Sequence, residues 1–319
     1  MNLAIAILNW NGKHWLKRFL PNVIKHSPNA EIYVIDNAST DDSIAFLTTN
    51  FPEVRIIRNE TNQGFAGGYN EGLKHISAEL YCLLNSDVEV TEGWLSPVLR
   101  LFNRDETIAA VQPKIRDFNQ EGYFEFAGAA GGLIDNLGYP YCRGRIFEQL
   151  EKDHGQYDDE QEISWSSGCC LFIRREDFWR CGGFDERFFA HQEEIDLCWR
   201  LRNQGRKIYY TGFSTVYHVG GGTLNKQNPQ KTYLNIRNNL SMLLKNLPKH
   251  LLWLIFFRLC LDGIAGIYFG LKNGLPHLWA VVRAHFAFYA QAPETWRRRA
   301  PHQKRNYYQT KWLVFKHFL

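Results

Sequence analysis

The residues best suited to chemistry lie where predicted strands end. Residues 81–84 (YCLL) are apolar and predict a buried strand, which stops at Asn85, Ser86 and Asp87. All three residue types favour turns, because their side chains bond to the nearby backbone. A carboxylate at the carboxyl end of a strand also lies where open α/β sheets bind ligands. Asp87 therefore has two interpretations, a turn residue or a ligand to a metal ion.

Three other predicted strands also end on polar residues. Residues 3–8 lead to Asn9–Asn11, residues 31–35 lead to Asp36–Asp41, and residues 54–58 lead to the loop 59–70. A single polar strand end is ordinary turn chemistry. Four of them on one edge predict a common ligand site, since the carboxyl ends of parallel strands face the same edge of a sheet.

The elements between these strand ends predict the fold class. The four strands alternate with helical patterns at intervals of roughly 22 to 28 residues, which is typical of βαβ units and a parallel sheet. Further along, strands are predicted at 108–112, 169–173, 207–210 and 214–217, a helix at 193–204, and loops with short antiparallel strands near an acceptor site at 113–163.

The usual nucleotide-binding loops are not found where they would be expected. The Rossmann fingerprint G-x-G-x-x-G should follow the first strand, but the chain has Asn-Trp-Asn-Gly at 9–12. It has no G-x-x-x-x-G-K-[ST] phosphate loop either. Gly64, Gly67 and Gly68 follow the third strand instead. There they would let the backbone approach a ligand closely or let a helix pack tightly on the sheet.

Several motifs together give the chain a resemblance to a known family. They are ILNWNG, VIDNASTDDS, RNETNQGFAGGYNEG, LLNSDVEV, SGCCLFIRREDFWRCGGFDERFFAHQEEIDLCWRLRNQG and VYHVGGGT, in this order. In order and spacing they resemble family 2 glycosyltransferases with the GT-A fold, and within that family the rhamnosyltransferase-like branch. The resemblance implies an α/β, GT-A nucleotide-sugar-binding fold with a Rossmann-like, mostly parallel sheet as a catalytic domain over residues 1–240.

The resemblance assigns the strand ends to a nucleotide-sugar donor. It implies that Asp36 and the turn Asn9–Asn11 hold the nucleobase and ribose, and that Asn85 and Asp87 stand at the D-x-D position with Asp87 as the metal ligand. The strict motif has Asp where this chain has Asn85, which leaves the contribution of Asn85 open. The predicted donor-binding residues are Asn9, Trp10, Asn11, Asp36, Asn37, Ser39, Asn62, Gly64, Gly67, Gly68, Asn70 and Asn85.

A diphosphate leaving group calls for a divalent metal, Mg²⁺ or Mn²⁺. Such ions prefer oxygen ligands and neutralise phosphate charge, so Asp87 is the first predicted ligand. The family often places a histidine at the position of His218, which is the second predicted ligand. A lone histidine is more often an ordinary packed or loop residue. The glycines at 220–222 favour the ligand interpretation, because they let the backbone approach a phosphate.

Three acids in HQEEIDLCWR are candidates for the base that deprotonates the acceptor hydroxyl. In a helix, Glu193 and Asp196 share a face and Glu194 points about a quarter-turn away. The ordinary interpretation is an acidic first turn that the helix dipole stabilises. Clustered acids with raised pKa values, however, make good general bases. The family's base matches Glu194, and the choice between Glu193 and Glu194 stays open.

One base and one metal-bound diphosphate imply a single displacement with inversion at the anomeric carbon. This inference rests on the family resemblance, which supplies no nucleophile on the opposite face of the sugar. The residues predicted on the acceptor side are Trp165, Ser167, Gly168 and Asp196.

The C-terminal region differs from the rest in charge. Residues 250–319 carry ten Lys and Arg against two Asp and Glu, whereas residues 1–249 carry 27 against 31. The apolar run 251–270 is long enough to span a bilayer, but Arg258 and Asp262 would each cost about 2.5–3.5 kcal/mol near its centre. Apolar helices with Trp beside Arg clusters suit the interface of an anionic membrane. Residues 241–319 are therefore predicted to be a helical membrane-associating extension, and whether 251–270 spans or lies on the membrane stays open.

These observations predict a metal-dependent, inverting glycosyltransferase in the cytoplasm, on the inner face of the cell membrane. Seven cysteines without C-x-x-C spacing favour a reducing compartment, and the N-terminus does not have the pattern of a signal peptide. The donor would be dTDP-rhamnose or a UDP- or GDP-sugar, and the acceptor a hydroxyl of a cell-surface glycan or of a polyprenyl-linked carrier. Nucleic acid is not a predicted partner, because no binding motif is present.

Two other classes of protein compete with this prediction. A sugar-nucleotide nucleotidyltransferase would need a Gly-rich loop with Arg or Lys after the first strand, where the chain has residues 9–12. A non-catalytic nucleotide-sugar or carbohydrate-binding protein would not depend on Asp87 or Glu194 for its function.

Overall fold

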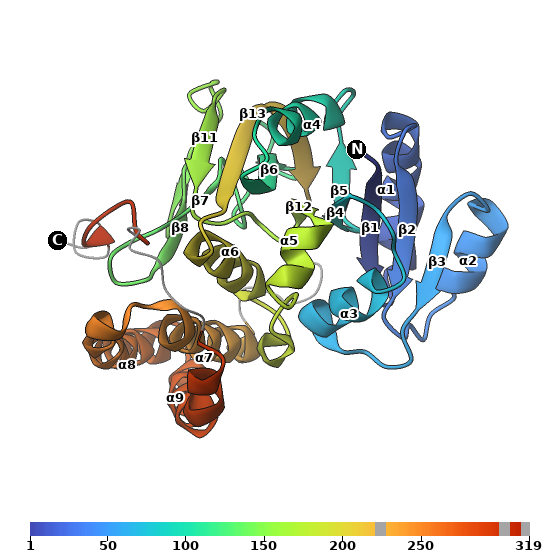
Figure 1. The fold of residues 1–319 in the computed structure, drawn as a ribbon. Helices are drawn as coiled ribbons and strands as arrows, with labels where there is room; N and C mark the ends of the chain where they lie inside the picture. Colours follow the sequence, from blue (N-terminus) through green and yellow to red (C-terminus); the bar gives the residue numbers. More distant parts are fainter. Residues whose placement is uncertain (221–227, 300–306, 314–319) are drawn as a thin grey trace.

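The computed structural model describes residues 1–220, 228–299 and 307–313 (Figure 1). Its first third alternates strands and helices: β1 (Leu3–Asn9), α1 (Lys13–His26), β2 (Glu31–Asp36), α2 (Ser43–Asn50), β3 (Arg55–Arg58), α3 (Gly64–Leu73) and β4 (Leu80–Asn85). The four strands lie in the order β3-β2-β1-β4 and all neighbours run parallel. The predicted βαβ units and parallel sheet are confirmed.

Strand register brings the predicted strand ends together. Asn9 is paired with Asp36 across β1 and β2, and Leu8 is paired with Asn85 across β1 and β4. The apolar residues of β1 and β4 are buried on both faces of the sheet. Their polar last residues therefore lie together at one edge, as the sequence predicts.

The other strands make the sheet mixed. Next to β4 lie β12 (Cys170–Arg174), β6 (Ile108–Asp117), β13 (Lys207–His218) and β11 (Glu160–Ile163), and β5 (Val88–Val90) also pairs with β13. β12 is antiparallel to both β4 and β6, whereas β13 is parallel to β6. The structure is thus the mostly parallel α/β sheet that was predicted, with antiparallel strands on one side.

The prediction of two short strands at 207–210 and 214–217 is wrong in detail, because they form the single strand β13. Its register against β6 shifts between Thr211 and Thr215, which marks a bulge. Gly212 lies within the bulge, and a Cβ there would come 2.2 Å from the carbonyl oxygen of Tyr157. The bulge lets the strand continue to His218, so His218 ends a strand beside β5.

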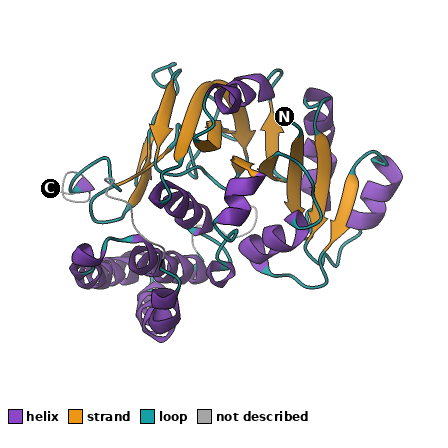
Figure 2. Cartoon of the chain, viewed as in Figure 1, coloured by secondary structure: helices purple, strands orange, loops and turns teal. Residues whose placement is uncertain are grey.

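Helices cover both faces of the sheet (Figure 2). One face packs against α1, α2 and α4 (Leu95–Arg104), and the other packs against α3, α5 (Arg175–Arg180) and α6 (Glu193–Asn203). In α4, for example, Val98, Leu101 and Phe102 are buried at helical spacing. Two apolar layers therefore hold the sheet and fix its strand ends.

The region between β6 and β11 contains a small antiparallel sheet. Its strands are β7 (Gly132–Ile134), β8 (Pro140–Cys142), β9 (Arg145–Ile146) and β10 (Gln149–Leu150). Short antiparallel strands were predicted in this region.

The C-terminal helices are α7 (Pro229–Asn246), α8 (Trp253–Asn273) and α9 (Leu275–Arg297). They gather on one side of the molecule, away from α2 and β3 (Figure 1). Position 240, the predicted domain boundary, falls inside α7. Arg258 and Asp262 of α8 are each 2% exposed, and Arg258 Nη1 donates to the carbonyl oxygen of Leu137 at 2.8 Å. These two charged residues in the apolar part of α8 therefore face the protein.

Residues 307–313 return to the catalytic body. Tyr307 stacks on Trp199 of α6 with ring centroids 5.2 Å apart and an interplanar angle of 17°. Its carbonyl oxygen accepts from Arg202 Nη1 at 3.1 Å, and Thr310 forms a parallel bridge with Asp135. Residues 307–313 are therefore packed on α6, and removing residues 241–319 would expose the surface of that helix.

Candidate functional site

The first part of the site is a polar cluster at the ends of β1 and β2. Asn9 Nδ2 donates to Asp36 Oδ1 and to Ser39 Oγ, both at 3.1 Å. The backbone N–H of Asn11 donates to the same Ser39 oxygen at 2.9 Å, and Asn11 has a left-handed backbone with φ of 52°. Asn9 and Asp36 are buried, whereas Trp10 is 50% exposed. The cluster brings together the side chains predicted for the nucleobase and ribose.

An asparagine network holds the next loop. Asn37 Nδ2 donates to Asn62 Oδ1 at 2.9 Å and to the Gly64 carbonyl at 3.0 Å. Asn59 Nδ2 donates to Asn37 Oδ1 at 3.1 Å and to the Gly68 carbonyl at 3.0 Å. The side chains of Asn37 and Asn62 thus bond to protein atoms and fix the start of α3. Asn59 was missed as an individual residue, although its place directly after β3 could have signalled it.

The predicted donor residues of α3 also contact protein atoms. A Cβ at Gly64 would lie 2.5 Å from the Phe189 carbonyl, and the glycine has a φ of +72°. Cβ atoms at Gly67 and Gly68 would meet Gln63 and Asn37 at 2.7 and 2.9 Å. These contacts favour the tight-packing interpretation of the glycines.

Asn70 lies away from the strand ends and holds a second loop. Its amide nitrogen donates to the Phe184 carbonyl at 2.9 Å, and its oxygen accepts from the Phe184 N–H at 2.9 Å. The donor-binding expectation for Asn70 is therefore not supported by its position, since its side chain bonds to this loop.

Asp87 and His218 lie side by side between β4, β5 and β13. His218 Nε2 is 3.2 Å from Asp87 Oδ1 and 3.3 Å from Asn85 Nδ2. His218 Nδ1 faces Glu125 Oε1 at 3.4 Å. Asp87, His218 and Glu125 are all at most 7% exposed. β13 delivers His218 to this place because its last residues pair with β5, which directly follows Asp87.

The electrostatics of this group reflect its burial. Burial alone disfavours the charge on Asp87, but the hydrogen bond and charge of His218 lower the pKa of Asp87 below its usual value. Burial also disfavours a charged imidazole, yet Cys169, Glu125 and Asp87 together raise the pKa of His218. The Asp87 carboxylate thus stabilises positive charge on the His218 imidazole, and that charge stabilises the carboxylate.

The donor set fits a divalent metal. An unprotonated Nε2 and a carboxylate oxygen both carry lone pairs, so atoms 3.2 Å apart need a proton or a metal ion between them. Two ligands at right angles on an octahedral Mg²⁺ would be about 3 Å apart. Among the described residues, no group of three or more His, Cys, Asp or Glu is placed to hold a metal ion. Asp87 and His218 would therefore provide two ligands and leave the other positions to diphosphate and water.

The second reactive group is a pair of carboxyls at the start of α6, of which Glu193 is buried and Glu194 is half-buried. Neither Glu193 Oε2 nor Glu194 Oε2 has a hydrogen-bond partner. Burial raises the pKa of Glu194 to about 7. Burial, followed by the charge of Glu194, raises the pKa of Glu193 well above its usual value. The two carboxyls interact, so they titrate as a pair, and a pKa of about 7 suits Glu194 to accept a proton near neutral pH. This favours Glu194 as the base.

The loop before α6 is held in an unusual conformation. Phe189, His191 and Gln192 have φ values of 63°, 71° and 75°. Asn238 of α7 donates to the carbonyls of Phe188, Ala190 and His191 at 3.0, 2.9 and 2.7 Å. Non-glycine residues rarely adopt positive φ unless the surroundings impose it. Asn238 therefore fixes the loop that precedes Glu193 and Glu194, and through it the position of the two carboxyls.

His191 is a further buried group of this loop that the sequence did not single out. Burial lowers the pKa of His191 to about 4, so the imidazole is neutral near pH 7. A single histidine in a loop gave no pattern that could have identified it.

Asp196 does not lie on the acceptor side as expected. Its carboxylate, which is fully buried, accepts from Arg200 Nε at 2.7 Å, Lys245 Nζ at 2.9 Å and Asn246 Nδ2 at 2.8 Å. Lys245 and Asn246 belong to α7, so these contacts turn the Asp196 carboxylate toward that helix. Asp196 is an ion-pair residue that joins α6 to α7.

Replacing Asp196 with Asn should lower the free energy of unfolding by about 3 to 5 kcal/mol, because it leaves buried Lys245 and Arg200 without a full counter-charge. Urea denaturation followed by circular dichroism measures the change. Glu176→Gln is the control, since that carboxylate is 81% exposed in a surface pair with Arg180, and it should leave stability nearly unchanged. Wild-type stability of Asp196→Asn would contradict the structural role.

The other predicted acceptor-side residues lie in the segment before β12. Trp165 is buried, and its Nε1 donates to the Leu133 carbonyl at 2.9 Å, so it packs on β7. The N–H of Ser167 donates to Gln112 Oε1 at 2.8 Å. Gly168 alone adjoins the carboxyl pair, because a Cβ there would lie 3.9 Å from Glu194 Cβ.

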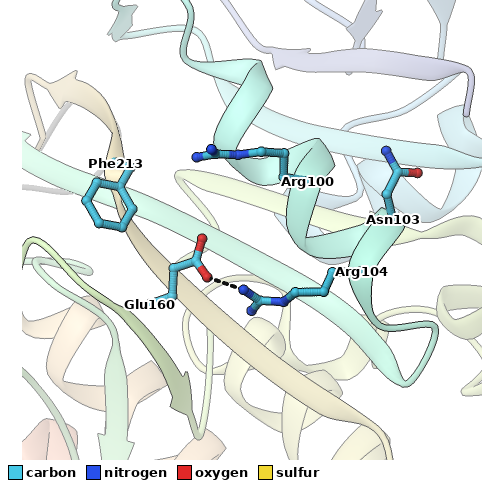
Figure 3. Close-up of a pocket in the computed structure, with 5 residues that line it drawn as sticks. All are labelled: Arg100, Asn103, Arg104, Glu160 and Phe213. Atoms are coloured by element: carbon cyan, nitrogen blue, oxygen red, sulfur yellow. Dashed lines mark hydrogen bonds and ion pairs between the residues drawn. The ribbon is translucent and has the colours of Figure 1, made fainter.

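A surface pocket lies elsewhere, between α4, β11 and β13 (Figure 3). It is lined by Arg100, Asn103, Arg104, Glu160 and Phe213, and Arg104 is ion-paired with Glu160 at 2.6 Å. None of the predicted site residues lines it, so we do not assign it to the reaction.

The fold and the strand-end site define the class of protein as a GT-A glycosyltransferase. The chain superimposes with a TM-score of 0.64 on GalNAc-T7 with UDP, GalNAc and Mn²⁺, at 16% identity, over 92% of this chain and 58% of that one. It superimposes with a TM-score of 0.54 on a mannosyltransferase from Pyrobaculum calidifontis in complex with GDP-Man and Mn²⁺, at 15% identity, over 92% and 75% of the two chains. At these identities the likeness shows the fold.

Residues 4–182 match the sequence profile of glycosyl transferase family 2, and the chain belongs to this family. It is 26% identical over 231 residues to the N-acetylglucosaminyl-diphospho-decaprenol L-rhamnosyltransferase of Mycobacterium tuberculosis, over 67% of this chain and 75% of that protein. It is 29% identical over 199 residues to an O-antigen biosynthesis protein of Myxococcus xanthus, over 60% of this chain and 15% of that protein. The predicted family and fold are confirmed, and the class of activity is transfer of a sugar from a nucleotide-sugar.

Proposed function

We propose that the chain transfers a sugar from a nucleotide-diphosphate donor to an acceptor hydroxyl with inversion, using Asp87 and His218 toward the leaving group and Glu194 as the base. One observation carries the proposal. The segment Gly168–Cys169 adjoins both centres: the Cys169 carbonyl accepts from the Asn85 N–H at 2.9 Å, and Gly168 adjoins Glu194. Asn85, whose side chain lies 3.3 Å from His218 Nε2, and Glu194 thus both adjoin one short segment, which supports a single site for the two proposed tasks.

Each group has one task in this mechanism. The cluster of Asn9, Asp36 and Ser39 binds the nucleoside. Asp87 and His218 would hold a divalent ion, which would neutralise charge on the departing diphosphate. Glu194, ionised and half-buried, accepts the proton of the acceptor hydroxyl as that oxygen attacks the anomeric carbon. The attack and the departure occur on opposite faces of the sugar, so the configuration inverts.

The names of the relatives support a donor and acceptor class. One relative is a rhamnosyltransferase acting on a diphospho-decaprenol-linked sugar, and another belongs to O-antigen biosynthesis. We propose dTDP-rhamnose or a UDP- or GDP-sugar as the donor. The acceptor we propose is a cell-surface glycan or a polyprenyl-linked sugar at the inner face of the membrane.

A panel of nucleotide-sugars tests the proposed function. Purified protein is incubated with Mn²⁺ or Mg²⁺ and each dTDP-, UDP- or GDP-sugar, and release of the nucleoside diphosphate is measured. We expect metal-dependent release with one class of donor, and faster release when the matching acceptor is present. Binding of a donor without turnover in the presence of any acceptor would instead support the non-catalytic alternative.

We also propose that α8 and α9 bind the surface of an anionic membrane. The helix Lys249–Asn273 is long and apolar enough to cross a membrane by length and composition, which alone is weak evidence. Its middle residue Arg258, however, bonds to the catalytic body at Leu137. The opposite face of α8 is an exposed apolar stripe with helical spacing, Trp253, Phe256, Ile264, Ile267 and Leu271. A helix fixed to the catalytic body by one face and apolar on the other suits the membrane interface more than a span.

Charge on the neighbouring surface supports the choice of an anionic membrane. Exposed Lys272, Arg283 and Arg297 accompany the exposed aromatic residues Trp279 and Trp296 on α8 and α9. Cationic side chains near a bilayer surface each contribute about 1 kcal/mol with anionic lipids, and Trp favours the headgroup region.

Replacing Phe256 and Leu271 together with Ser should weaken binding to phosphatidylglycerol-containing vesicles by about 100-fold or more, because each side chain buries apolar surface worth about 1.5–3 kcal/mol and each 1.36 kcal/mol corresponds to a factor of ten. Flotation with vesicles measures the bound fraction. The control is Phe213→Ser, which removes an exposed apolar side chain 56% accessible on β13, away from these helices. Equal flotation of the double variant and the wild type would contradict the interfacial assignment.

A further inference from the structure

The buried carboxylate of Glu125 has no role in the mechanism described so far. It is 5% exposed, and within the described residues no Lys or Arg forms a salt bridge with it. The one cationic partner that the structure shows is His218, whose Nδ1 lies 3.4 Å from Glu125 Oε1. Its other oxygen accepts from the N–H of Ala127 at 2.5 Å. A buried carboxylate is costly unless it is paired or hydrogen-bonded, so its position beside the imidazole requires an explanation.

The fold places Glu125 there through the backbone. The N–H of Glu125 donates to the Ile115 carbonyl on β6 at 3.0 Å, and the N–H of Ile115 donates to the Ala129 carbonyl at 3.0 Å. On its other side β6 pairs with β13, where Asp117 is opposite His218. The segment 125–129 and the end of β13 are therefore fixed to the same strand.

The two nitrogens of His218 have different surroundings. Nδ1 faces an acceptor, Glu125 Oε1, whereas Nε2 lies 3.3 Å from the amide nitrogen of Asn85, which is a donor. An amide N–H can donate only to a nitrogen with a free lone pair. Glu125 and Asn85 therefore favour the tautomer with a proton on Nδ1 and a free lone pair on Nε2. Asp87 Oδ1, 3.2 Å from Nε2, accepts a proton from that nitrogen unless a metal ion lies between the two atoms.

We propose that Glu125 is a positioning residue that holds His218 in the Nδ1-protonated tautomer and so keeps Nε2 available as a metal ligand beside Asp87. The proposal rests on the metal-binding role of Asp87 and His218 in the proposed function. Carboxylates that accept from the second nitrogen of a ligating histidine fix the ring and its tautomer. At 3.4 Å the contact is too long for a hydrogen bond, and among the described residues the buried Nδ1 has no hydrogen-bond partner. The proposal therefore requires this contact to shorten when the metal ion binds.

The test measures metal binding and the tautomer directly, without an activity assay. Mn²⁺ is titrated into the full chain, and the free ion is followed by electron paramagnetic resonance. The tautomer is read from the ring ¹⁵N resonances of His218 with Mg²⁺ present, assigned by comparison with His218→Gln. We expect Glu125→Ala to weaken Mn²⁺ binding by about 10- to 100-fold and to lose the Nδ1-protonated form.

Companion variants separate positioning from folding. Glu125→Gln keeps an acceptor oxygen and should lose several-fold less affinity than Glu125→Ala. Glu125→Asp keeps the buried charge, but its shorter side chain moves the carboxylate away from His218 Nδ1. Its Mn²⁺ affinity and tautomer should therefore resemble those of Glu125→Ala, and it provides the test if Glu125→Ala folds poorly. Glu121→Gln changes an exposed carboxylate on the same segment and should behave as the wild type. Unchanged Mn²⁺ affinity and tautomer in folded Glu125→Ala or Glu125→Asp would overturn the proposal.

Asp87→Ala distinguishes this inference from the proposed function. If Asp87→Ala loses Mn²⁺ binding and the Glu125 variants do not, then Glu125 is structural and the metal site stands. If Asp87→Ala binds Mn²⁺ as tightly as the wild type, then Asp87 is not a metal ligand. The proposed role of Glu125, which rests on that metal site, is then wrong as well.

Discussion

Replacing Glu194 with Gln should lower kcat by a factor of about 10² to 10⁴ and leave donor binding nearly unchanged, because it removes the group that accepts the acceptor proton. Gln has the same shape and cannot take a proton. Glu193→Gln should lower kcat less than tenfold, since burial and the charge of Glu194 raise the pKa of Glu193 and Gln resembles the neutral acid that this shift favours. Steady-state rates with the donor identified in the panel, together with donor affinity by calorimetry, measure both effects.

The two variants are each other's control, because the residues are adjacent at the start of α6, with Glu193 buried and Glu194 half-buried. Glu60→Gln, on an exposed loop position, serves as the matched surface control. The reverse order, with a large loss in Glu193→Gln and a small one in Glu194→Gln, would assign the base to Glu193. A small effect in both would show that neither carboxyl is the base.

The pH dependence follows from the same carboxyl. Because the pKa of Glu194 is about 7 in the folded protein, its base form is lost below that pH, and kcat should rise with pH through about 7 and then level off. The contribution of Glu194 to the free energy of unfolding changes in the opposite direction, because it falls as pH rises. The folded pKa lies above the unfolded value near 4.5, so the protonated side chain stabilises the fold and this contribution is lost as pH rises from about 4.5 to about 7. Glu194→Gln should abolish the kcat inflection and reduce the fall in stability, measured by rates and urea midpoints at pH 5 and 8.

The edge of the parallel sheet could be predicted from the sequence because both of its determinants are local. Apolar runs with polar last residues identify strands and their ends, and the βαβ alternation fixes their common direction. Asn9, Asp36 and Asn85 are therefore found together as predicted.

What a side chain contacts beyond its own strand end could not be predicted in the same way. Asn37 and Asp87 both follow strands, yet Asn37 bonds to the loop before α3 and Asp87 faces His218. Asp196 looked like a member of an acidic first turn, and its partner Lys245 is 49 residues away in the chain. Such contacts depend on how α7 packs on α6, which no short sequence pattern records.

Glu125 illustrates the same limit at the metal site. It lies in a region where the sequence predicted only loops and short strands, and no motif marks it. Its significance comes from the pairing of β6 with β13, which brings it to His218 from 93 residues away along the chain. Residues that support a ligand are harder to predict than the ligands, because their partner is a side chain and not a substrate with known chemistry.

Replacing Asp87 with Ala should abolish the activation of transfer by Mn²⁺ or Mg²⁺ and lower kcat/KM by about 10² to 10³. A metal ion that neutralises a leaving group contributes several kcal/mol to the barrier, and each 1.36 kcal/mol corresponds to a factor of ten. Asp87→Asn should show nearly the same loss, because the amide keeps the shape but not the charge that attracts the cation. Initial rates across a Mn²⁺ titration measure the effect.

The fold should survive both Asp87 variants, because the backbone carbonyl of Asp87, and not its side chain, accepts the N–H of Val219 at 3.1 Å. Circular dichroism and the urea midpoint check this point. Asp42→Asn is the matched control, because the Asp42 carboxylate is 65% exposed and pairs with Lys13 at the surface. This variant should leave metal activation intact.

Because the donor nucleoside is bound by a separate cluster at Asn9 and Asp36, Asp87→Ala should still bind the nucleoside monophosphate with wild-type affinity while losing the metal-dependent part of diphosphate binding. If Asp87→Ala keeps full metal activation, the assignment of Asp87 as the metal ligand is wrong. If it loses nucleoside monophosphate binding as well, then Asp87 supports the whole strand-end site and not the leaving group alone.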